Sequence, residues 1–518
     1  MMGEKLRLGI DVGGTNTDAV LMAGQEVVAT AKQFTTADVR DGVIASVASI
    51  LDQSGVDRAS IKAVMIGTTQ FVNAFVQRRD LAPVAAIRVA LPMGDGIPPF
   101  SGWPDDAVES VGGHRYMIGG GSYFNGTEYR PLDEDALRAA ALDARAKGID
   151  CFAISANFSP IRPDIEARAA AIVAACVPGA MITLSSEIGG PGLLDRENGA
   201  IINASLGPLA KRVVASLQQA IHDLRIDAPI FLSQNDGTLI STDVAARLPI
   251  MTCSAGPTNS IRGAAFLTGI KEAVVVDIGG TTADIGFLRE GFARETTLPN
   301  YLGGVRTNFR MPDLLSIGVG GGSLVRPDGR VGPRSVGFRL QQEGMVFGGD
   351  TLTATDIAVR AGHVRLGDPQ AVAGLDAALV EAALDDMHLQ IEDGIDQVKV
   401  SPEPLPLILV GGGSILLSRP LKGTSETLRP AHAAVANAVG AAIALVSGQV
   451  NKLYDFRTHG RDAALAQARE EATNAAVAAG AARDEVEVID IRELPMSHMR
   501  SGMVQVRVRA VGPLVGHA

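Results

Sequence analysis

The sequence predicts an α/β protein of two lobes around a cleft, with a small α/β appendage at the C-terminus. Three observations lead to this prediction. The chain has 518 residues, which is too long for one ordinary domain and long enough for two or three. A short glycine-containing segment occurs twice, and a third glycine-rich loop follows the second copy. A repeated segment indicates the architecture early, because each copy marks the same place in one lobe.

The repeated segment reads IDVGGTNTDAVLM at 10–22 and VDIGGTTADIGFL at 276–288. Each copy begins in one apolar run and ends in another. We therefore expect a strand, a glycine turn and a second strand, which together form a β-hairpin. Aligned without gaps, the copies share an aspartate, two glycines, a threonine and a second aspartate: Asp11/Asp277, Gly13/Gly279, Gly14/Gly280, Thr15/Thr281 and Asp18/Asp284.

The residue types of this loop suit phosphate binding. Two successive glycines lack Cβ atoms, so backbone N–H groups can approach phosphate oxygens, and the threonine adds a hydroxyl donor. The leading aspartate stands where a metal ion that bridges the phosphates could be held. Gly-Gly-Thr also suits a plain hairpin, but a structural turn has no need to repeat Asp and Thr at fixed offsets. We predict that phosphates contact Gly13, Gly14, Thr15, Gly279, Gly280, Thr281 and Thr282, and that Asp11 and Asp277 hold the metal and serve catalysis.

The third glycine-rich loop lies at 407–417 and reads LILVGGGSILL. A buried strand that ends in three glycines and opens into a helix would let a nucleoside lie flat against the backbone. An ordinary strand-to-helix turn explains the same residues, and the position after both phosphate loops is what favours the nucleoside. The residues predicted to bracket the nucleoside are Gly411, Gly412, Gly413 and Ser414.

Two stretches rich in alanine and glycine, at 254–267 and 433–442, are predicted to be helices. Small residues at helical spacing let two helices cross closely, as a hinge between lobes requires. Each stretch, considered alone, could also be an ordinary core helix.

Beyond them, the tail shows an alanine-rich helix near 463–482 and two β-like segments, at 485–491 and 503–510. We expect this tail to pack on a lobe. The predicted parts are a first lobe with an α/β insertion at 1–190, a second lobe at 191–450 and the appendage at 451–518.

Composition and charge exclude several classes of protein. Hydrophobic residues make up 46% of the chain and charged residues 20%, and the net charge is -11. An acidic chain without a run of basic residues argues against a nucleic-acid partner and against an anionic membrane surface. The N-terminal sequence lacks the apolar core of a signal peptide, and no segment reaches about 18 uninterrupted apolar residues. We therefore expect a cytoplasmic protein.

Cysteine and histidine give no sign of a metal centre. Cys151, Cys176 and Cys253 are far apart in sequence and form no Cys-x-x-Cys pair, so we expect buried thiols in a reducing compartment. His114 and His432 have no second ligand at metal spacing, and we interpret both as structural or surface residues.

The order of phosphate loop, connecting helix, phosphate loop, nucleoside loop and connecting helix resembles the superfamily of actin, Hsp70 and sugar kinases. Within it, the sequence is most similar to the hydantoinase/oxoprolinase family, specifically the A subunit of ATP-dependent hydantoinases. The similarity extends over nearly the whole chain. The blocks that carry it, besides 10–21, are GTTQFVNA at 67–74, LDRENGAIINASLGP at 194–208, SQNDGTL at 233–239, the helix at 254, SIGVGGGS at 316–323, VGPRSVG at 331–337 and GGDTLTATD at 348–356.

This resemblance implies actin-like, ribonuclease H-like lobes around a nucleotide cleft, with ATP and Mg²⁺ as cofactors. It also implies ATP-driven ring opening of a cyclic amide such as a hydantoin, an oxoproline or a lactam, an oligomeric state, and a separate B-type subunit as partner. The chain departs from longer members of the family at 338–344, where FRLQQEG replaces a Pro-Gly-Pro-Ala-Cys-Tyr-Gly stretch, and it lacks their extended C-terminal region.

Two alternative functions stay open. A small-molecule kinase of the same fold would use identical phosphate loops, but it would leave phosphate on its product. A nucleotide-gated regulatory ATPase would bind ATP without this chemistry. For the base or the group that orients the substrate, the sequence offers five carboxylates, each of which also fits a structural hydrogen-bonding role: Asp18, Asp284, Glu197, Asp236 and Asp350.

Overall fold

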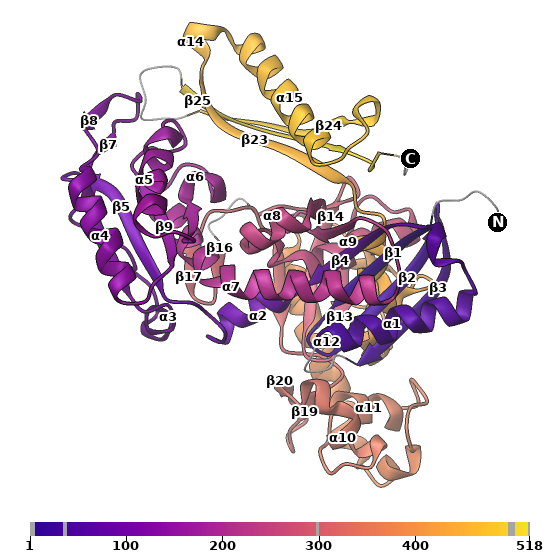
Figure 1. Ribbon diagram of the computed structural model, residues 1–518. Helices are drawn as coiled ribbons and strands as arrows, with labels where there is room; N and C mark the ends of the chain where they lie inside the picture. The colour runs from indigo at the N-terminus through magenta and orange to yellow at the C-terminus, as the bar shows by residue number, and fades with distance from the viewer. Residues whose placement is uncertain (1–5, 35–38, 297–299, 496–502, 516–518) are drawn as a thin grey trace.

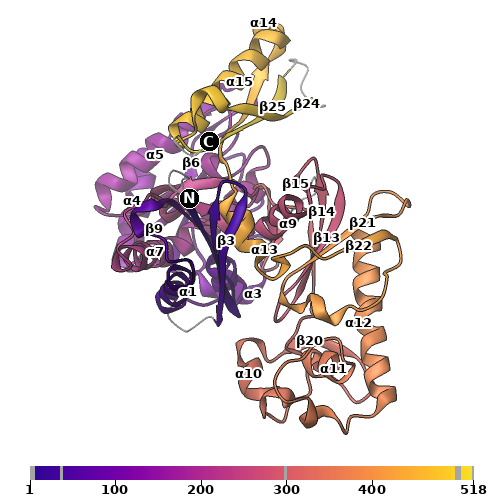
Figure 2. The same ribbon diagram turned by 90° about the vertical axis from the view of Figure 1, so that its right-hand side faces the viewer.

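The computed structural model describes residues 6–34, 39–296, 300–495 and 503–515. In each of its two central sheets, the first strand of the hairpin lies between its antiparallel hairpin partner and a parallel strand, β4 in the first sheet and β21 in the second. The first sheet has nine strands in the order β24-β25-β23-β12-β11-β4-β1-β2-β3, and the second runs β15-β14-β13-β21-β22, with β18 added beside β14. Figure 2 shows β3 and β13 in separate halves, with α9 and α13 between them. The two-lobed α/β fold predicted from the sequence is confirmed.

In the first lobe, the strands alternate with helices in the usual α/β manner (Figure 1). Strand β1 pairs antiparallel with β2 and parallel with β4, and β4 pairs parallel with β11. The bounds are β1 Leu6–Val12, β2 Asn16–Ala23, β3 Glu26–Phe34, α1 Val39–Ser54, β4 Ile61–Thr68, α2 Gln70–Val76, α7 Leu193–Asp223, β11 Ile230–Ser233, β12 Leu239–Ser241 and α9 Ala255–Thr268.

A separate four-stranded sheet is inserted between α2 and α7, as the sequence predicted. Its strands are all parallel, and helices α4 and α5 pack against them. Parallel strands covered by helices are buried, which explains why β5 and β9 are almost wholly apolar. The bounds are β5 Val84–Leu91, β6 His114–Gly119, α4 Glu134–Ala146, β9 Cys151–Ala156, α5 Pro163–Cys176 and β10 Met181–Leu184.

The second lobe repeats the hairpin and then adds a small region of short elements between β14 and β21, below the sheet in Figure 1. The bounds are β13 Ala273–Ile278, β14 Ala283–Arg289, β15 Phe292–Ala293, β18 Leu314–Ile317, β19 Ser323–Val325, β20 Val331–Ser335, α10 Leu340–Glu343, α11 Ala354–Arg360, α12 Ala377–Val398, β21 Leu405–Val410, β22 Thr424–Leu428 and α13 Ala436–Ala442.

The third glycine-rich loop follows strand β21, but it does not open into the predicted α-helix. The structure shows a 3-10 helix at Gly412–Leu416, after which the chain is extended. Proline at 420 and glycine at 423 oppose a longer helix, because proline lacks an N–H donor and glycine gains most freedom outside a helix.

Helices α9 and α13 cross at very short distance between the lobes, as their small residues predicted. A Cβ atom built at Gly263 would lie 1.9 Å from the carbonyl oxygen of Ala436, and one at Gly440 would lie 1.9 Å from that of Asn259. Both positions therefore require glycine, since any side chain would force the helices apart.

The tail forms the predicted helix and two strands, with bounds α15 Arg461–Ala478, β24 Glu487–Pro495 and β25 Met503–Gly512, and strand β23 Val446–Asp455 precedes them. These strands extend the first sheet at its edge, and α15 packs on β23 and β25. The tail is therefore joined to the first lobe. The boundaries 1–190, 191–450 and 451–518 stay a prediction. The strands within residues 230–241 and 446–455 belong to the same sheet as the first hairpin.

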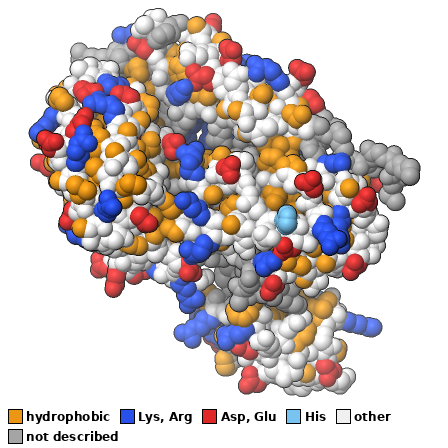
Figure 3. Space-filling model, in the orientation of Figure 1, with side chains coloured by type: hydrophobic (Ala, Val, Ile, Leu, Met, Phe, Trp, Pro, Cys, Tyr) orange, Lys and Arg blue, Asp and Glu red, His pale blue; other side chains and the backbone are white. Residues whose placement is uncertain are grey.

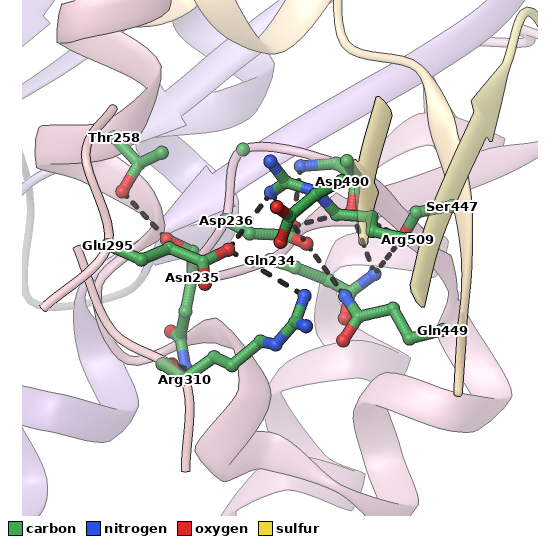
Figure 4. Close-up of polar contacts among 12 residues, drawn as sticks. Gln234, Asn235, Asp236, Thr258, Glu295, Arg310, Ser447, Gln449, Asp490 and Arg509 are labelled. Carbon is green, nitrogen blue, oxygen red and sulfur yellow. Dashed lines mark hydrogen bonds and ion pairs between the residues drawn. The ribbon is translucent and has the colours of Figure 1, made fainter. Parts of the chain in front are cut away.

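A buried polar network ties the tail to the body of the protein (Figure 4). Asp236 accepts a hydrogen bond from Gln449 on β23 at 2.7 Å and faces Arg509 on β25 at 3.6 Å. Arg509 also pairs with Glu295 at 3.1 Å, and Glu295 lies 3.7 Å from Arg310. Buried charges require such pairing, so Asp236 is a structural residue at the junction of tail and lobe.

On the molecular surface, acidic and basic side chains lie interspersed over the face shown in Figure 3. Within the described ranges, no helix combines the length and the apolar character that crossing a bilayer requires.

Candidate functional site

The three glycine loops meet at one cavity of about 490 Å³ between the lobes. The two hairpin turns close in the same way, with Gly13 N–H donating to Asn16 at 3.0 Å and Gly279 N–H donating to Thr282 at 2.9 Å. They also face each other, because a Cβ atom at Gly280 would lie 2.9 Å from the Thr15 side chain. The predicted loop residues that line the cavity are Gly13, Gly14, Thr15, Gly279, Gly280, Thr281, Thr282, Gly411, Gly412 and Gly413.

Two of the predicted residues lie outside this lining. Ser414 lies within the 3-10 helix, between the lining residues Gly413 and Ile415. Asp11 lies behind the first loop and is only 3% exposed. The third loop also approaches the second hairpin, since a Cβ atom at Gly411 would lie 2.2 Å from Asp277 Oδ1. The third loop therefore packs directly on the second phosphate loop.

Asp11 belongs to a buried polar cluster with incomplete hydrogen bonding. Its Oδ2 accepts a hydrogen bond from Asn437 at 2.9 Å, whereas its Oδ1 has no partner among the described residues. The side chain of Asn259 on α9 is likewise without a partner in the described ranges. Both groups lie around Gly67, where a Cβ atom would come within 2.4 Å of Asp11 Oδ1 and 2.7 Å of Asn259 Nδ2. Buried polar atoms left unpaired are costly, so this cluster favours a polar ligand or an ion.

Burial and repulsion between carboxylates disfavour the charged form of Asp11. Burial raises its pKa to about 7, and the neighbouring Asp18 and Asp277 add to the effect. Burial also raises the pKa of Asp277, although a short hydrogen bond from Ser260 on α9 opposes the rise. Asp18 forms an ion pair with Lys32 at 2.6 Å and accepts a hydrogen bond from Asn437 at 3.0 Å.

These carboxylates fit a divalent cation. Asp11, Asp18 and Asp277 come together, and Lys32 is the single basic side chain among the described residues that line the cavity. A hard cation such as Mg²⁺ prefers carboxylate oxygens and would offset the repulsion that, after burial, helps to raise the pKa of Asp11 and of Asp277. No compact group of three or more potential ligands forms among the described residues, so such an ion would keep several waters or phosphate oxygens in its shell.

Several lining residues escaped the sequence analysis. A largely apolar part of the cavity wall comes from 340–366 and from the 3-10 helix of the third loop; its members are Leu340, Gln341, Phe347, Leu366 and Ile415. No motif marks these residues, because an apolar wall has no fixed spacing. Asn437 and Ser260 lie within the helices read as a hinge, where a polar residue in an alanine-rich stretch was the available signal.

A second cavity, of about 740 Å³, adjoins the first on the other side of the phosphate loops. The two cavities share Gly14, Thr15, Thr281 and Thr282 as lining residues. Asp284 lines the second cavity and accepts a short hydrogen bond from Ser316. Of the five candidate carboxylates, Asp18 and Asp284 are therefore the two that line these cavities.

The other candidates lie elsewhere. Glu197 is buried in an ion pair with Arg88, with Arg88 Nε to Oε2 at 2.7 Å, and is structural. Asp350 is exposed in a loop. His114 lies on β6 of the inserted sheet, and His432 has a left-handed backbone just before α13. Neither histidine lines the cavities at the phosphate loops.

The strand order and the paired loops place this protein in the actin-like class. Its sequence matches the hydantoinase/oxoprolinase N-terminal region over residues 7–177 and the hydantoinase/oxoprolinase domain over residues 196–368. The chain belongs to the hydantoinase/oxoprolinase family and is similar to its A subunits.

Among individual relatives, the alpha subunit of caprolactamase from Pseudomonas jessenii is 28% identical over 434 residues, which cover 76% of this chain and 59% of the relative. The chain thus spans about three-fifths of that relative's length. The solved structure of the ATP-dependent caprolactamase from Pseudomonas jessenii matches 98% of this chain and 88% of its own, with a TM-score of 0.73 and 21% identity.

Nucleotide-free acetone carboxylase matches 99% of this chain and 89% of its own, with a TM-score of 0.73 and 20% identity. The structural matches support the fold, which is shared by proteins named for different reactions.

Proposed function

We propose that this chain is the ATP-using subunit of an enzyme that hydrolyses a cyclic amide. The observation that carries the proposal is the convergence of two equivalent Asp-x-Gly-Gly-Thr hairpins and a third glycine loop on one cavity, beside a buried Asp11 that lacks a full set of partners. The name of the caprolactamase relative, at 28% identity, supports an amide over other substrates.

The chain's own residues would act mainly by positioning. Backbone N–H groups of the two hairpin turns and the hydroxyls of Thr15, Thr281 and Thr282 surround the shared wall of the two cavities, where the phosphates would lie. The apolar wall at Leu340, Phe347 and Leu366 would receive the nucleoside. A bound Mg²⁺ would neutralise phosphate charge, and Asp11 and Asp277 would hold it directly or through water.

Phosphorylation explains why such an enzyme needs ATP. Amide resonance makes the carbonyl carbon a poor electrophile, and a phosphorylated carbonyl oxygen becomes a leaving group. When the carbonyl oxygen attacks the terminal phosphorus, an O–P bond forms, the bond to ADP breaks and the amide N–H proton is released. Such transfer depends on alignment and charge neutralisation more than on covalent help from the protein.

A partner is part of the proposal. The hairpins that line the two cavities supply groups that would hold the phosphates. The described residues offer no further group of side chains that would hydrolyse the activated ring. An activated amide must also be protected from premature attack by water, which favours completion of the site by a second subunit of B type. We expect the isolated chain to bind ATP and to open cyclic amides poorly.

The test is phosphate release and ring opening with ATP and a panel of cyclic amides, measured for the chain alone and with a B-type subunit. We expect coupled activity in the pair and little in the chain alone. Asp11→Asn and Asp277→Asn should each lower metal-dependent turnover by at least a hundredfold while the fold is retained. Full metal-dependent turnover in both variants would reject the site.

The small-molecule kinase remains the second candidate, because it would use the same paired hairpins to hold the phosphates. A kinase would accumulate a phosphorylated product, whereas the proposed amidase releases free phosphate. A regulatory ATPase would hydrolyse ATP at a rate that cyclic amides do not change.

A further inference from the structure

The second cavity lies where the phosphoryl acceptor would have to lie. It adjoins the first cavity through Gly14, Thr15, Thr281 and Thr282, and neither Leu340 nor Phe347, of the first cavity's apolar wall, is among its lining residues. A nucleotide whose base lies against that wall and whose phosphates reach the hairpins would direct its terminal phosphate at this shared boundary. The cavity, of about 740 Å³, is large enough for a small ring.

The charged side chains that described residues contribute to this second cavity are all acidic. Among the described residues that line this second cavity there is no lysine, arginine or histidine, whereas two residues, Asp284 and Asp313, carry carboxylates. Asp313 is neutralised by Arg294, whose Nη2 and Nε lie 2.6 Å and 3.0 Å from Asp313 Oδ2. Asp284 forms no ion pair in the described part of the chain and accepts its hydrogen bond from the neutral hydroxyl of Ser316.

The remaining lining is neutral and of mixed polarity. Apolar side chains come from α2, from the start of α9 and from 301–338, and amide or hydroxyl groups lie between them; the apolar members are Val72, Pro257, Tyr301, Met311, Leu314 and Phe338. Asn73 on α2 lies near the first phosphate loop, since its Nδ2 is 3.9 Å from the Cβ position of Gly14. Such walls suit a ring that is partly apolar and has an amide edge.

The second aspartates of the two hairpins, Asp18 and Asp284, thus have different surroundings. Asp18 lines the first cavity and is paired with Lys32, whereas Asp284 lines the second and has no cation partner in the described ranges. In both hairpins this aspartate lies opposite the leading one in the strand register, Asp11 with Asp18 and Asp277 with Asp284. The second aspartate of each hairpin thus lines a different cavity, and of these two only Asp284 has no cation partner among the described residues.

We propose that the second cavity binds the phosphoryl acceptor, that Asp284 receives the hydrogen bond of its ring N–H, and that the site selects an uncharged cyclic amide over one that bears a carboxylate. This inference rests on the proposed function and specifies its substrate class. An acceptor with its own carboxylate would meet Asp284 and the terminal phosphate without a compensating cation from the lining, which disfavours it. A neutral lactam N–H would instead satisfy the carboxylate that Ser316 only partly occupies.

The test compares two ligands with one ring, 2-pyrrolidone and 5-oxoproline, which differ by a carboxylate. Binding is measured by calorimetry on the full chain saturated with a non-hydrolysable ATP analogue and Mg²⁺. We expect 2-pyrrolidone to bind at least tenfold more tightly. Asp284→Asn should reduce this preference below threefold, because it weakens the N–H hydrogen bond and relieves the repulsion of the carboxylate.

A pair of variants on α2 tests the location. Val72→Phe adds bulk to the cavity wall and should weaken 2-pyrrolidone at least tenfold, with ATP affinity unchanged within twofold. Val76→Phe makes the same substitution at a position that is 50% exposed and outside the lining, and should leave both affinities unchanged. Melting temperatures of the variants establish that each is folded.

The outcomes separate this inference from the proposed function. Tighter binding of 5-oxoproline, or an unchanged preference in Asp284→Asn, would overturn the selectivity. Lactam-stimulated phosphate release that survives Val72→Phe unaltered would overturn the location while the proposed function stands. If no lactam binds the chain or stimulates phosphate release in the pair with its B-type partner, the proposed function fails and this inference fails with it.

Discussion

Replacing Asp11 by asparagine should stabilise the metal-free protein at high pH while it abolishes metal-dependent activity. Asp11 is 3% exposed, and burial together with Asp18 and Asp277 raises its pKa from 3.8 to about 7. The folded protein therefore retains a proton that the unfolded chain releases. The stabilisation that the bound proton of Asp11 gives to the folded state is fully present below pH about 4, and it is lost as the pH rises through about 7. Since one pKa unit corresponds to about 1.4 kcal/mol, the loss reaches up to about 4 kcal/mol above pH 7.

Asparagine has the shape of the protonated acid and avoids this loss. We expect Asp11→Asn to unfold at higher denaturant concentration than the wild type at pH 8 in EDTA, and to lose this advantage as the pH is lowered to 4. Asp350→Asn, which changes an exposed loop carboxylate, is the control and should match the wild type at both values. Adding Mg²⁺ and ATP at pH 8 should stabilise the wild type more than Asp11→Asn, because the variant lacks one of the two carboxylates proposed to hold the metal. A variant that is equally or less stable than the wild type at pH 8 would refute the account of this cluster.

Three further predictions follow from the packing around the site. A Cβ atom at Gly440 would lie 1.9 Å from the carbonyl oxygen of Asn259, so Gly440→Val should lower the free energy of unfolding by about 3 kcal/mol or more. Gly374→Val, where a Cβ atom meets open space, is the control in the same denaturation measurement. Gly412→Val places a side chain in the cavity and should raise the Kd for ATP at least tenfold, with a smaller effect on turnover at saturating ATP. Unchanged ATP binding in calorimetry would show that this loop has only a structural role. Burial raises the pKa of the Cys253 thiol to about 12, so at pH 8 iodoacetamide should label it at least a hundredfold more slowly in the native protein than in the denatured chain, and equal rates would contradict its burial.

Much of the architecture could be predicted because duplication makes it visible in the sequence. The two hairpins carry equivalent aspartates, Asp11 and Asp277, at the next-to-last position of their first strands, and their turns close with the same hydrogen bond at Gly13 and Gly279. The small residues of the two connecting helices predicted their crossing, since close approach leaves room for nothing larger than glycine at 263 and 440. Local chemistry and long-range packing agree at these positions, which is why a pattern of residues was sufficient.

Long-range pairings could not be predicted in the same way. The nine-stranded sheet joins the first hairpin to strands near residue 240 and residue 450, and no local signal gives the partner of a buried strand. The apolar wall of the first cavity escaped notice for a related reason, because Leu340 and Phe347 are ordinary in sequence and gain their place only from the fold. Asp236 and Glu197 were candidates as polar residues in family-like blocks, and the structure shows both in buried networks that stabilise the fold.

The measurement that tests the central claim most directly is a crystal structure of the chain with Mg²⁺ and a non-hydrolysable ATP analogue. We predict that the nucleoside lies against the third glycine loop and Phe347, and that the terminal phosphate lies between Thr15 and Thr281 with the metal coordinated by Asp11 or Asp277, directly or through water. A nucleotide bound outside this cavity, or one whose phosphates contact neither hairpin, would contradict the account.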